Sequence, residues 1–235
     1  MYFREQAFRA LNYWFQQPLG QAVAQTISEE ISDLNLRAPG PSVLQIGAES
    51  QGTWLHLNPM CRRYVLTPYL NHAPGAVVGL CEDLPFLTHS IHLAFLPCVL
   101  ELLSERGSLF RELDRVLTED GYLIICGINP LSLFGLAQCF KAQSLLPFLK
   151  TKLYNSAEVR HMLLEQGFQI EVFKRFCCVP PLVSERVWQY MTFLGRLGLC
   201  PRNMYLLVVR KKTHTLLPLR PFRRFREVAY GGEFA

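Results

Sequence analysis

The chain has 235 residues, of which 50% are hydrophobic and 18% are charged, and its formal net charge is +5. This length and composition exclude extensive disorder, and they favour one large α/β domain with short extensions over two equal domains. No run reaches the roughly 18 uninterrupted apolar residues of a membrane span, so no transmembrane segment is expected.

The first residues, MYFREQAFRALNYWF, place charged side chains among aromatic ones and lack the apolar core and cleavage site of a secretion signal. The eight cysteines show no C-x-x-C spacing, and several fall in apolar runs. That pattern is typical of small buried hydrophobes and argues against a zinc site. Both observations favour a cytoplasmic protein without a bound metal.

Two amphipathic helices are predicted before the first strand. Apolar residues recur at near-helical spacing in residues 2–17, and a second helix is expected at about 19–36. Pro18 and Gly20 interrupt the pattern between them. We expect residues 1–40 to form a helical extension that packs beside a sheet.

Strands and helices alternate from Ser42 onward, which predicts a mostly parallel sheet with helices on both faces. Asn155 fits the start of one helix, because its side-chain oxygen can accept a hydrogen bond from a first-turn amide and Glu158 lies three residues later. The expected strands are 43–46, 64–66, 76–80, 91–96, 122–126, 168–176 and 204–209, and the expected helices are 102–117, 156–166 and 184–197.

The run VLQIGAESQG, residues 43–52, has the form of a glycine-rich cofactor loop that follows a buried strand. Gly47 comes directly after the strand, where such loops begin. Glycine is usual at alternate positions, yet Glu49 occupies the second such position. Gln45 replaces an acid that often precedes the first glycine. The run therefore predicts a nucleotide-cofactor loop with altered chemistry.

The most informative run is residues 82–130, EDLPFLTHSIHLAFLPCVLELLSERGSLFRELDRVLTEDGYLIICGINP. It resembles the second half of class I S-adenosylmethionine-dependent methyltransferases, especially those acting on small molecules such as quinone precursors. The resemblance rests on many parts in fixed order and covers roughly residues 41–128. GINPLSLFGL and WFQQPLGQA are similar to segments of a small group of bacterial methyltransferase-like proteins. The matching parts are Glu82, 84–86, Ser90, Leu100 with Glu101, Arg111 with Glu112, 115–117 and Gly121.

The resemblance implies a Rossmann-like class I methyltransferase fold, in which a mostly parallel seven-stranded sheet ends in an antiparallel pair. It also implies S-adenosylmethionine as the cofactor. No catalytic residue is assigned, because methyl transfer to a positioned acceptor depends mainly on proximity. The cofactor-binding residues that the resemblance implies are Gly47, Ala48, Glu49, Glu82, Asp83 and Leu84.

Several positions depart from the family pattern. Glu49 adds a Cβ and a carboxylate where glycine lets the backbone approach the amino-acid end of the cofactor, although a carboxylate can pair with the cofactor's ammonium group. Thr67 and Leu80 replace acids that contact the ribose and the adenine amine, and His92 replaces an aspartate. Lost hydrogen bonds cost ~1 kcal/mol or more each, so these departures predict weakened or lost cofactor binding.

Three further features each have a functional and a structural interpretation. His92 is either a general base or a framework histidine, and we favour the latter. Asn129 and Pro130 resemble the NPP motif of amino-group methyltransferases, but they follow the fifth strand instead of the fourth, which favours a turn. Residues 131–149 have three interpretations: a lid over a lipophilic substrate, a membrane-surface patch, or a buried helix pair.

We expect a methyltransferase-like domain at 41–212, followed by a basic tail at 213–235. Residues 202–235 hold eight basic and two acidic side chains, whereas the rest of the chain holds 16 basic and 17 acidic ones. The motif RPFRRFR suits a solvated arm, nucleic acid or an anionic surface.

The leading hypothesis is S-adenosylmethionine-dependent methyl transfer to a small or lipophilic molecule. The alternative is a catalytically inactive pseudo-methyltransferase that acts as a scaffold or binding module for a protein or RNA partner through the tail. Activity depends above all on whether the cofactor can bind beside Glu49.

Overall fold

The computed structural model describes residues 2–34, 40–49, 60–130, 132, 153–176 and 203–211. The described residues form a seven-stranded sheet with strand order β3-β2-β1-β4-β5-β7-β6. β1 pairs in parallel with β2 and β4, β2 with β3, and β4 with β5, while β7 runs antiparallel between β5 and β6. The expected α/β class, the mostly parallel sheet and its antiparallel end are confirmed.

The strand positions follow the apolar runs of the sequence, because the central strands are largely buried. Their bounds are β1 Ser42–Ile46, β2 Arg62–Thr67, β3 Ala76–Val78, β4 Ile91–Pro97, β5 Leu117–Ile128, β6 Phe168–Phe176 and β7 Met204–Lys211. β3 is shorter than the expected strand 76–80, and the other described strands match within a few residues at each end.

β5 differs most from its prediction, because it begins at Leu117 and not at residue 122. Ile91 of β4 pairs with Leu117, and the next pair is Leu93 with Tyr122, so several residues of β5 lie outside the parallel ladder. Asp120 lies in this stretch with a φ of 64°. The residues between Leu117 and Tyr122 therefore form an irregularity inside one long strand.

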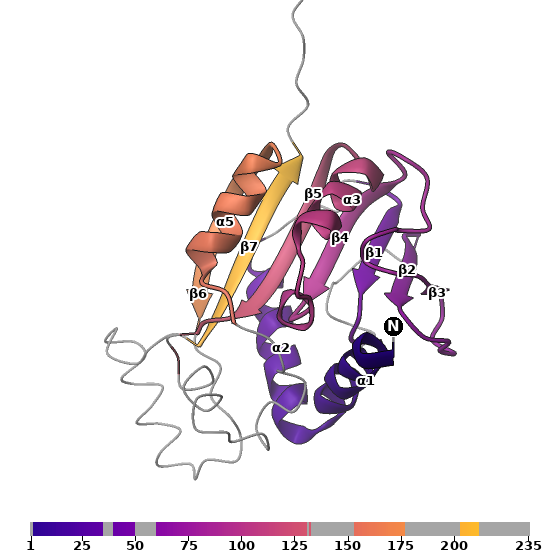
Figure 1. Ribbon diagram of the computed structural model, residues 1–235. Coiled ribbons are helices and arrows are strands. Elements are labelled where there is room, and N and C mark those ends of the chain that lie inside the picture. The colour runs from indigo at the N-terminus through magenta and orange to yellow at the C-terminus, as the bar shows by residue number, and fades with distance from the viewer. Residues whose placement is uncertain are drawn as a thin grey trace, which may run out of the picture.

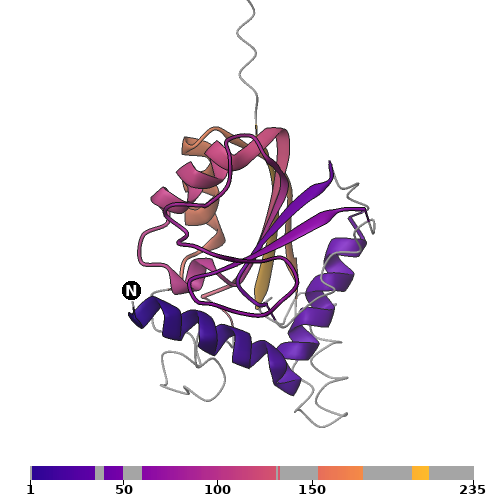
Figure 2. The same cartoon turned by 90° about the vertical axis from the view of Figure 1, so that its right-hand side faces the viewer.

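The described helices are α1 (Tyr2–Gln16), α2 (Pro18–Ser32), α3 (Gly107–Val116) and α5 (Ser156–Glu165), with a 3-10 turn η1 at Leu100–Leu102. α3 and α5 lie on one side of the sheet and α2 lies on the other (Figure 2). Helix 102–117 was predicted too long at its start, since residues 103–106 separate η1 from α3. Asn155 caps α5 as expected, with Ala157 N donating to its side chain at 3.3 Å.

The break between α1 and α2 places α1 across the ends of the strands. Pro18 occupies the first turn of α2, where its missing N–H costs nothing. A Cβ on Gly20 would lie 2.0 Å from the carbonyl oxygen of Trp14, so only glycine lets the two helices meet this closely. α1 consequently crosses below the carboxyl ends of β1 and β4 (Figure 1).

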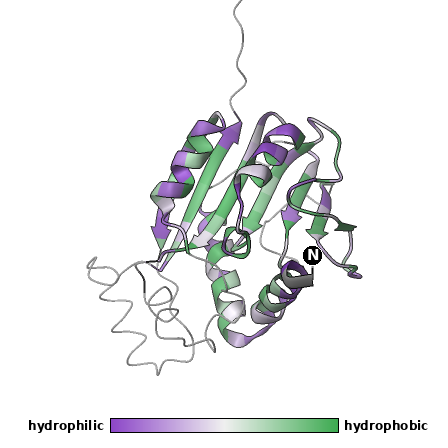
Figure 3. Ribbon diagram, in the orientation of Figure 1, coloured by the Kyte–Doolittle hydropathy of each residue, from purple (hydrophilic) through white to green (hydrophobic). Residues whose placement is uncertain are grey.

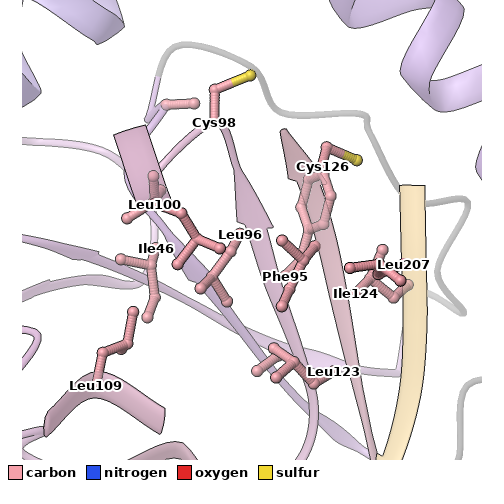
Figure 4. Close-up of a cluster of buried hydrophobic side chains, with 14 of the residues drawn as sticks. Ile46, Phe95, Leu96, Cys98, Leu100, Leu109, Leu123, Ile124, Cys126 and Leu207 are labelled. Atoms are coloured by element: carbon pink, nitrogen blue, oxygen red, sulfur yellow. The ribbon is translucent and has the colours of Figure 1, made fainter. Parts of the chain in front are cut away.

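The core lies between the sheet and the helices, and its strands are the most hydrophobic elements of the molecule (Figure 3). Figure 4 shows part of it, with Phe95, Leu96 and Ile124 from the central strands and Leu109 from α3 among the buried side chains. Phe8 and Phe15 of α1 belong to the same buried cluster. The predicted N-terminal extension thus shares one core with the sheet, although its boundary at residue 40 stays a prediction.

Some predictions fall outside the described residues. These are the helix at 184–197, nearly all of the segment 131–149, and the tail at 213–235. Within the described residues, no helix is long and apolar enough to cross a membrane. That part of the chain also contains no group of three or more His, Cys, Asp or Glu side chains placed to hold a metal ion.

Candidate functional site

The strand order reverses between β1 and β4, because the chain leaves β1 toward β2 and leaves β4 toward β5. In open parallel sheets, the loops at the carboxyl edge diverge at such a point and ligands bind between them. The two loops meet at Gly47, where a Cβ would lie 3.4 Å from Val99 and 3.3 Å from Phe8 of α1. Three segments therefore meet at the candidate site: the loop after β1, the loop after β4, and α1.

The loop after β1 is held in an unusual backbone conformation. Gly47 and Ala48 have φ values of 69° and 49°, in the left-handed region that suits glycine and strains alanine. The buried side chain of Gln45 stabilises this backbone conformation, because its Nε2 donates at 2.9 Å to both the Gly47 and the Ala48 carbonyl oxygens. Arg63 of β2 donates in turn to Gln45 Oε1. Gln45 is thus a structural component of this loop.

Glu49 projects from this loop toward α1 and the loop after β2. Its Oε1 accepts a 2.6 Å hydrogen bond from Asn12 Nδ2 and a 3.0 Å bond from Tyr69 Oη. Its Oε2 is buried, and among the described residues it has no hydrogen-bond partner. The carboxylate is therefore fixed through one oxygen, while the other lacks a donor.

Tyr69 is suited to donate to this carboxylate. Burial raises the pKa of its phenol well above the usual range, and the Glu49 charge raises it further. The phenol consequently keeps its proton at every physiological pH. Arg9 of α1 lies over the Tyr69 ring at 4.0 Å from the ring centroid, and both its Nε and Nη2 donate to Glu5. This network joins α1 to the loop after β2.

Thr67, at the end of β2, was the candidate for contacting the ribose. Its hydroxyl is buried, donates to the Tyr69 carbonyl at 2.8 Å and accepts from Asn71 Nδ2 at 2.6 Å. Because the hydroxyl hydrogen is already committed, Thr67 serves the turn after β2 in this structure. Leu80, which replaces the adenine-contacting acid, pairs with Asp83 in an isolated bridge.

The second predicted binding segment, Glu82 to Leu84, follows β3 at the same edge of the sheet. Glu82 forms an ion pair with Arg4 of α1. Asp83 is exposed, whereas the side chain of Leu84 is buried. α1 thus contacts all three loops in which the sequence predicts or suggests cofactor contacts.

The family-like motif around LPF is explained by a single cluster of hydrogen bonds. Leu84 N donates to Glu112 Oε2 at 2.8 Å. Arg115 donates at 2.9 Å to the carbonyl oxygens of both Leu84 and Phe86, and it also pairs with Glu112 at 2.7 Å. The LPF, RE and RVL parts of the motif are therefore coupled because α3 fixes the loop that precedes β4.

A buried acid lies beside the site at the carboxyl edge of β4. Glu101 Oε1 accepts a 2.8 Å hydrogen bond from Ile128 N at the end of β5. Burial raises the pKa of Glu101 to about 7, although that hydrogen bond and the nearby Arg106 oppose the rise. Arg106 lies 3.4 Å over the Tyr154 ring and donates to the Leu100 carbonyl. The sequence motif LE contained this residue without indicating its burial.

His92 and Asn129 occupy the structural roles that we favoured. His92 lies at the amino end of β4, away from the loops of the site, and its Nδ1 is 2.6 Å from Ser42 Oγ. Ser42 Oγ already donates to the Ser90 carbonyl, so His92 Nδ1 carries the hydrogen of this contact. Asn129 forms a turn in which Ser132 N donates to its carbonyl oxygen at 3.1 Å.

The structure brings Gly47, Ala48 and Glu49 together with residues that sequence reasoning did not select. Phe8, Asn12 and Tyr69 are distant in sequence from the glycine loop and have no motif of their own. Only the apolar periodicity of α1 signalled its burial, and that periodicity does not reveal which loops the helix covers.

Comparisons with known proteins agree with this architecture. Residues 61–125 match the family model described as "Methyltransferase domain". An uncharacterized protein of Escherichia coli, YafS, is 31% identical over 148 residues, a match that covers 61% of this chain and 57% of that protein. The alignment thus spans a little over half the length of this curated relative.

Two solved structures have similar folds at low identity. The first, from Thermotoga maritima, is described as an S-adenosylmethionine-dependent methyltransferase and possible histamine N-methyltransferase. It has a TM-score of 0.63 and 16% identity, covering 90% of this chain and 99% of that one. The [4+2]-cyclase SpnF has a TM-score of 0.58 and 14% identity, covering 91% and 94%. At such identities, the likeness establishes the fold alone.

Proposed function

We propose that the chain belongs to the class I S-adenosylmethionine-dependent methyltransferase family and that it transfers a methyl group from S-adenosylmethionine to a small or lipophilic molecule. The observation that carries the proposal is the loop after β1. It lies at the strand-order reversal, keeps a left-handed Gly47, and presents a carboxylate oxygen that lacks a partner among the described residues.

The side chains present fit a cofactor that carries a positive charge. A buried carboxylate oxygen without a donor is costly, so a bound cation with N–H groups would relieve that cost. Gly47, Ala48 and Glu49 would hold the cofactor from one side, with Glu82, Asp83 and Leu84 from the loop after β3. S-adenosylmethionine supplies an electrophilic methyl group on a sulfonium sulfur.

The remaining work of the protein is to position the acceptor and exclude water. Phe8 and Asn12 of α1 lie against the loop after β1, and Arg4 holds the loop after β3, so α1 shields this part of the carboxyl edge. The proposal of a small or lipophilic substrate rests on the apolar sequence of residues 131–149, nearly all of which lie outside the described residues. A cytoplasmic location likewise remains a prediction.

Calorimetric titration of the full chain with S-adenosylmethionine and S-adenosylhomocysteine tests this function. Saturable binding of both with a dissociation constant below about 1 mM is expected, which corresponds to roughly 4 kcal/mol of binding free energy. If neither ligand produces binding heat at millimolar concentration, the proposal is rejected.

A second candidate function, a pseudo-methyltransferase that acts as a scaffold or binding module, is favoured by different contacts. Asn12 and Tyr69 bond to Glu49, and the Thr67 hydroxyl bonds within its own turn, so these groups already have partners without a cofactor. A scaffold that engages a protein or RNA through residues 213–235 predicts that Glu49→Gly preserves the cellular phenotype while removal of those residues abolishes it. The reverse pattern would exclude this candidate.

A further inference from the structure

The two oxygens of the Glu49 carboxylate have different environments. Oε1 accepts hydrogen bonds from Asn12 and Tyr69, whereas Oε2 is buried and has no hydrogen-bond partner in the described part of the chain. An ionised oxygen in such a place loses its hydration without compensation. The position therefore favours a ligand group that carries both positive charge and N–H donors.

The described residues do not neutralise this charge with an ion pair. Arg9 lies over the ring of Tyr69, which donates to Glu49, and its guanidinium donates to Glu5. No ion pair joins Glu49 to a basic side chain within the described ranges. The protein thus orients the carboxylate with two neutral donors, and no basic side chain among the described residues pairs with it.

Gln45 cannot fill the same role, because its side chain is fully used by the protein. Its amide N–H groups bond to the Gly47 and Ala48 carbonyls, and its oxygen accepts from Arg63. The residue before the first glycine therefore shapes the loop, while the charged residue of the loop is Glu49.

Of the two cationic centres of S-adenosylmethionine, the sulfonium has no N–H donor and the α-ammonium has three. We propose that Glu49 is the residue of this chain that binds the cofactor's α-ammonium group, with Oε2 accepting the hydrogen bond while Asn12 and Tyr69 hold Oε1. This inference rests on the proposed function and adds the residue that recognises the amino-acid end. Glu49 accordingly aids cofactor recognition, in contrast to the obstruction that its size predicts from sequence alone.

The decisive experiment compares ligands that differ only at this group. Calorimetry on the full chain uses S-adenosylhomocysteine, its deamino analogue, in which hydrogen replaces the ammonium, and 5′-methylthioadenosine, which lacks the amino-acid part. The unmodified chain is expected to bind S-adenosylhomocysteine at least ~10-fold more tightly than the deamino analogue, which is the size of a hydrogen bond to a charged group. This comparison needs no variant and so does not depend on a variant's folding.

Glu49→Gln supplies the matched test from the side of the protein. Gln keeps an oxygen for Asn12 and Tyr69 but places an amide where Oε2 was, so affinity for S-adenosylhomocysteine should fall at least ~10-fold. Affinity for 5′-methylthioadenosine should change less than about twofold, because this ligand lacks the amino-acid part that would contact Glu49. The control is Glu119→Gln, which removes the same charge from an exposed position outside the site.

The outcomes separate the two proposals. If the unmodified chain binds neither S-adenosylhomocysteine nor 5′-methylthioadenosine, the proposed function fails and the Glu49 assignment with it. If it binds S-adenosylhomocysteine and the deamino analogue equally, the assignment alone fails. An equal loss of both S-adenosylhomocysteine and 5′-methylthioadenosine binding in Glu49→Gln would also overturn it, because the residue would then act only on the shape of the loop.

Discussion

Glu101 is a carboxylic acid that the fold encloses completely at the end of β4. Its Oε1 accepts from the Ile128 amide, and burial raises its pKa to about 7. An unfolded chain would release this proton near the ordinary value of 4.5. Between those two values the folded state binds more protons than the unfolded state, so this residue stabilises the fold at low pH and the contribution is lost as pH rises through about 7.

Glu101→Gln is expected to remove this pH dependence. The amide oxygen still accepts from Ile128 N but carries no charge, so the variant should gain stability over the unmodified protein as pH rises from about 5 to about 8, by on the order of 3 kcal/mol. Denaturant unfolding across that range measures the difference. A gap between the two proteins that stays constant with pH would contradict it, and exposed Glu119→Gln provides the control.

Gln45 shows what sequence comparison misses at the scale of a residue. Against the family pattern it is a missing acid, yet its amide donates to two carbonyls that a carboxylate would repel. The polar character and the burial-prone position of residue 45 were visible in the sequence. The direction of its hydrogen bonds depends on loop geometry, which no spacing of residues specifies.

At the scale of elements, α3 has a second role besides covering the sheet. Its Glu112 and Arg115 bond to the backbone of Leu84 and Phe86, and the hydrogen bond from the Arg115 guanidinium lowers the pKa of Glu112. The sequence predicted both the helix and the LPF motif, because apolar periodicity and motif order are local properties. It did not predict that one fixes the other, since their contact joins residues about 30 positions apart.

Arg115→Ala should therefore loosen the loop before β4. Loss of bonds to two carbonyls and one carboxylate is expected to cost about 1–3 kcal/mol of unfolding free energy. Amide exchange at Leu84 should also accelerate, because its acceptor Glu112 loses its partner. Thermal unfolding and hydrogen exchange by NMR measure both effects. Arg111→Ala, on the exposed face of the same helix, should change stability by less than about 0.5 kcal/mol; an equal loss there would refute the local explanation.

At the scale of the whole molecule, the N-terminal helices and the sheet form one hydrophobic core. Phe8, Leu11 and Phe15 of α1 and Val23 and Ile27 of α2 are fully buried in the same cluster as the central strands. Removal of one such side chain typically costs about 2–5 kcal/mol, while a whole domain is stable by only about 5–15 kcal/mol. We therefore expect the helices to be needed for folding, in addition to their place beside the site.

A chain that begins at Pro41 is expected not to fold cooperatively, because it would expose the sheet surface that α1 and α2 cover. Circular dichroism during thermal unfolding and size-exclusion chromatography would show this as loss of a sharp transition and as aggregation. A soluble truncated protein with an unchanged melting temperature would demonstrate instead that residues 1–40 are a dispensable extension.

The sequence by itself determined the α/β class, nearly all described strands and the methyltransferase resemblance, because apolar periodicity and motif order are local properties of the sequence. Only the tertiary structure decided that α1 lies over the loop after β1, that Gln45 shapes this loop, and that one oxygen of Glu49 lacks a partner among the described residues. These properties arise from contacts between distant segments. Their geometry is set by how helices and sheet close around a common core, and no local pattern encodes it.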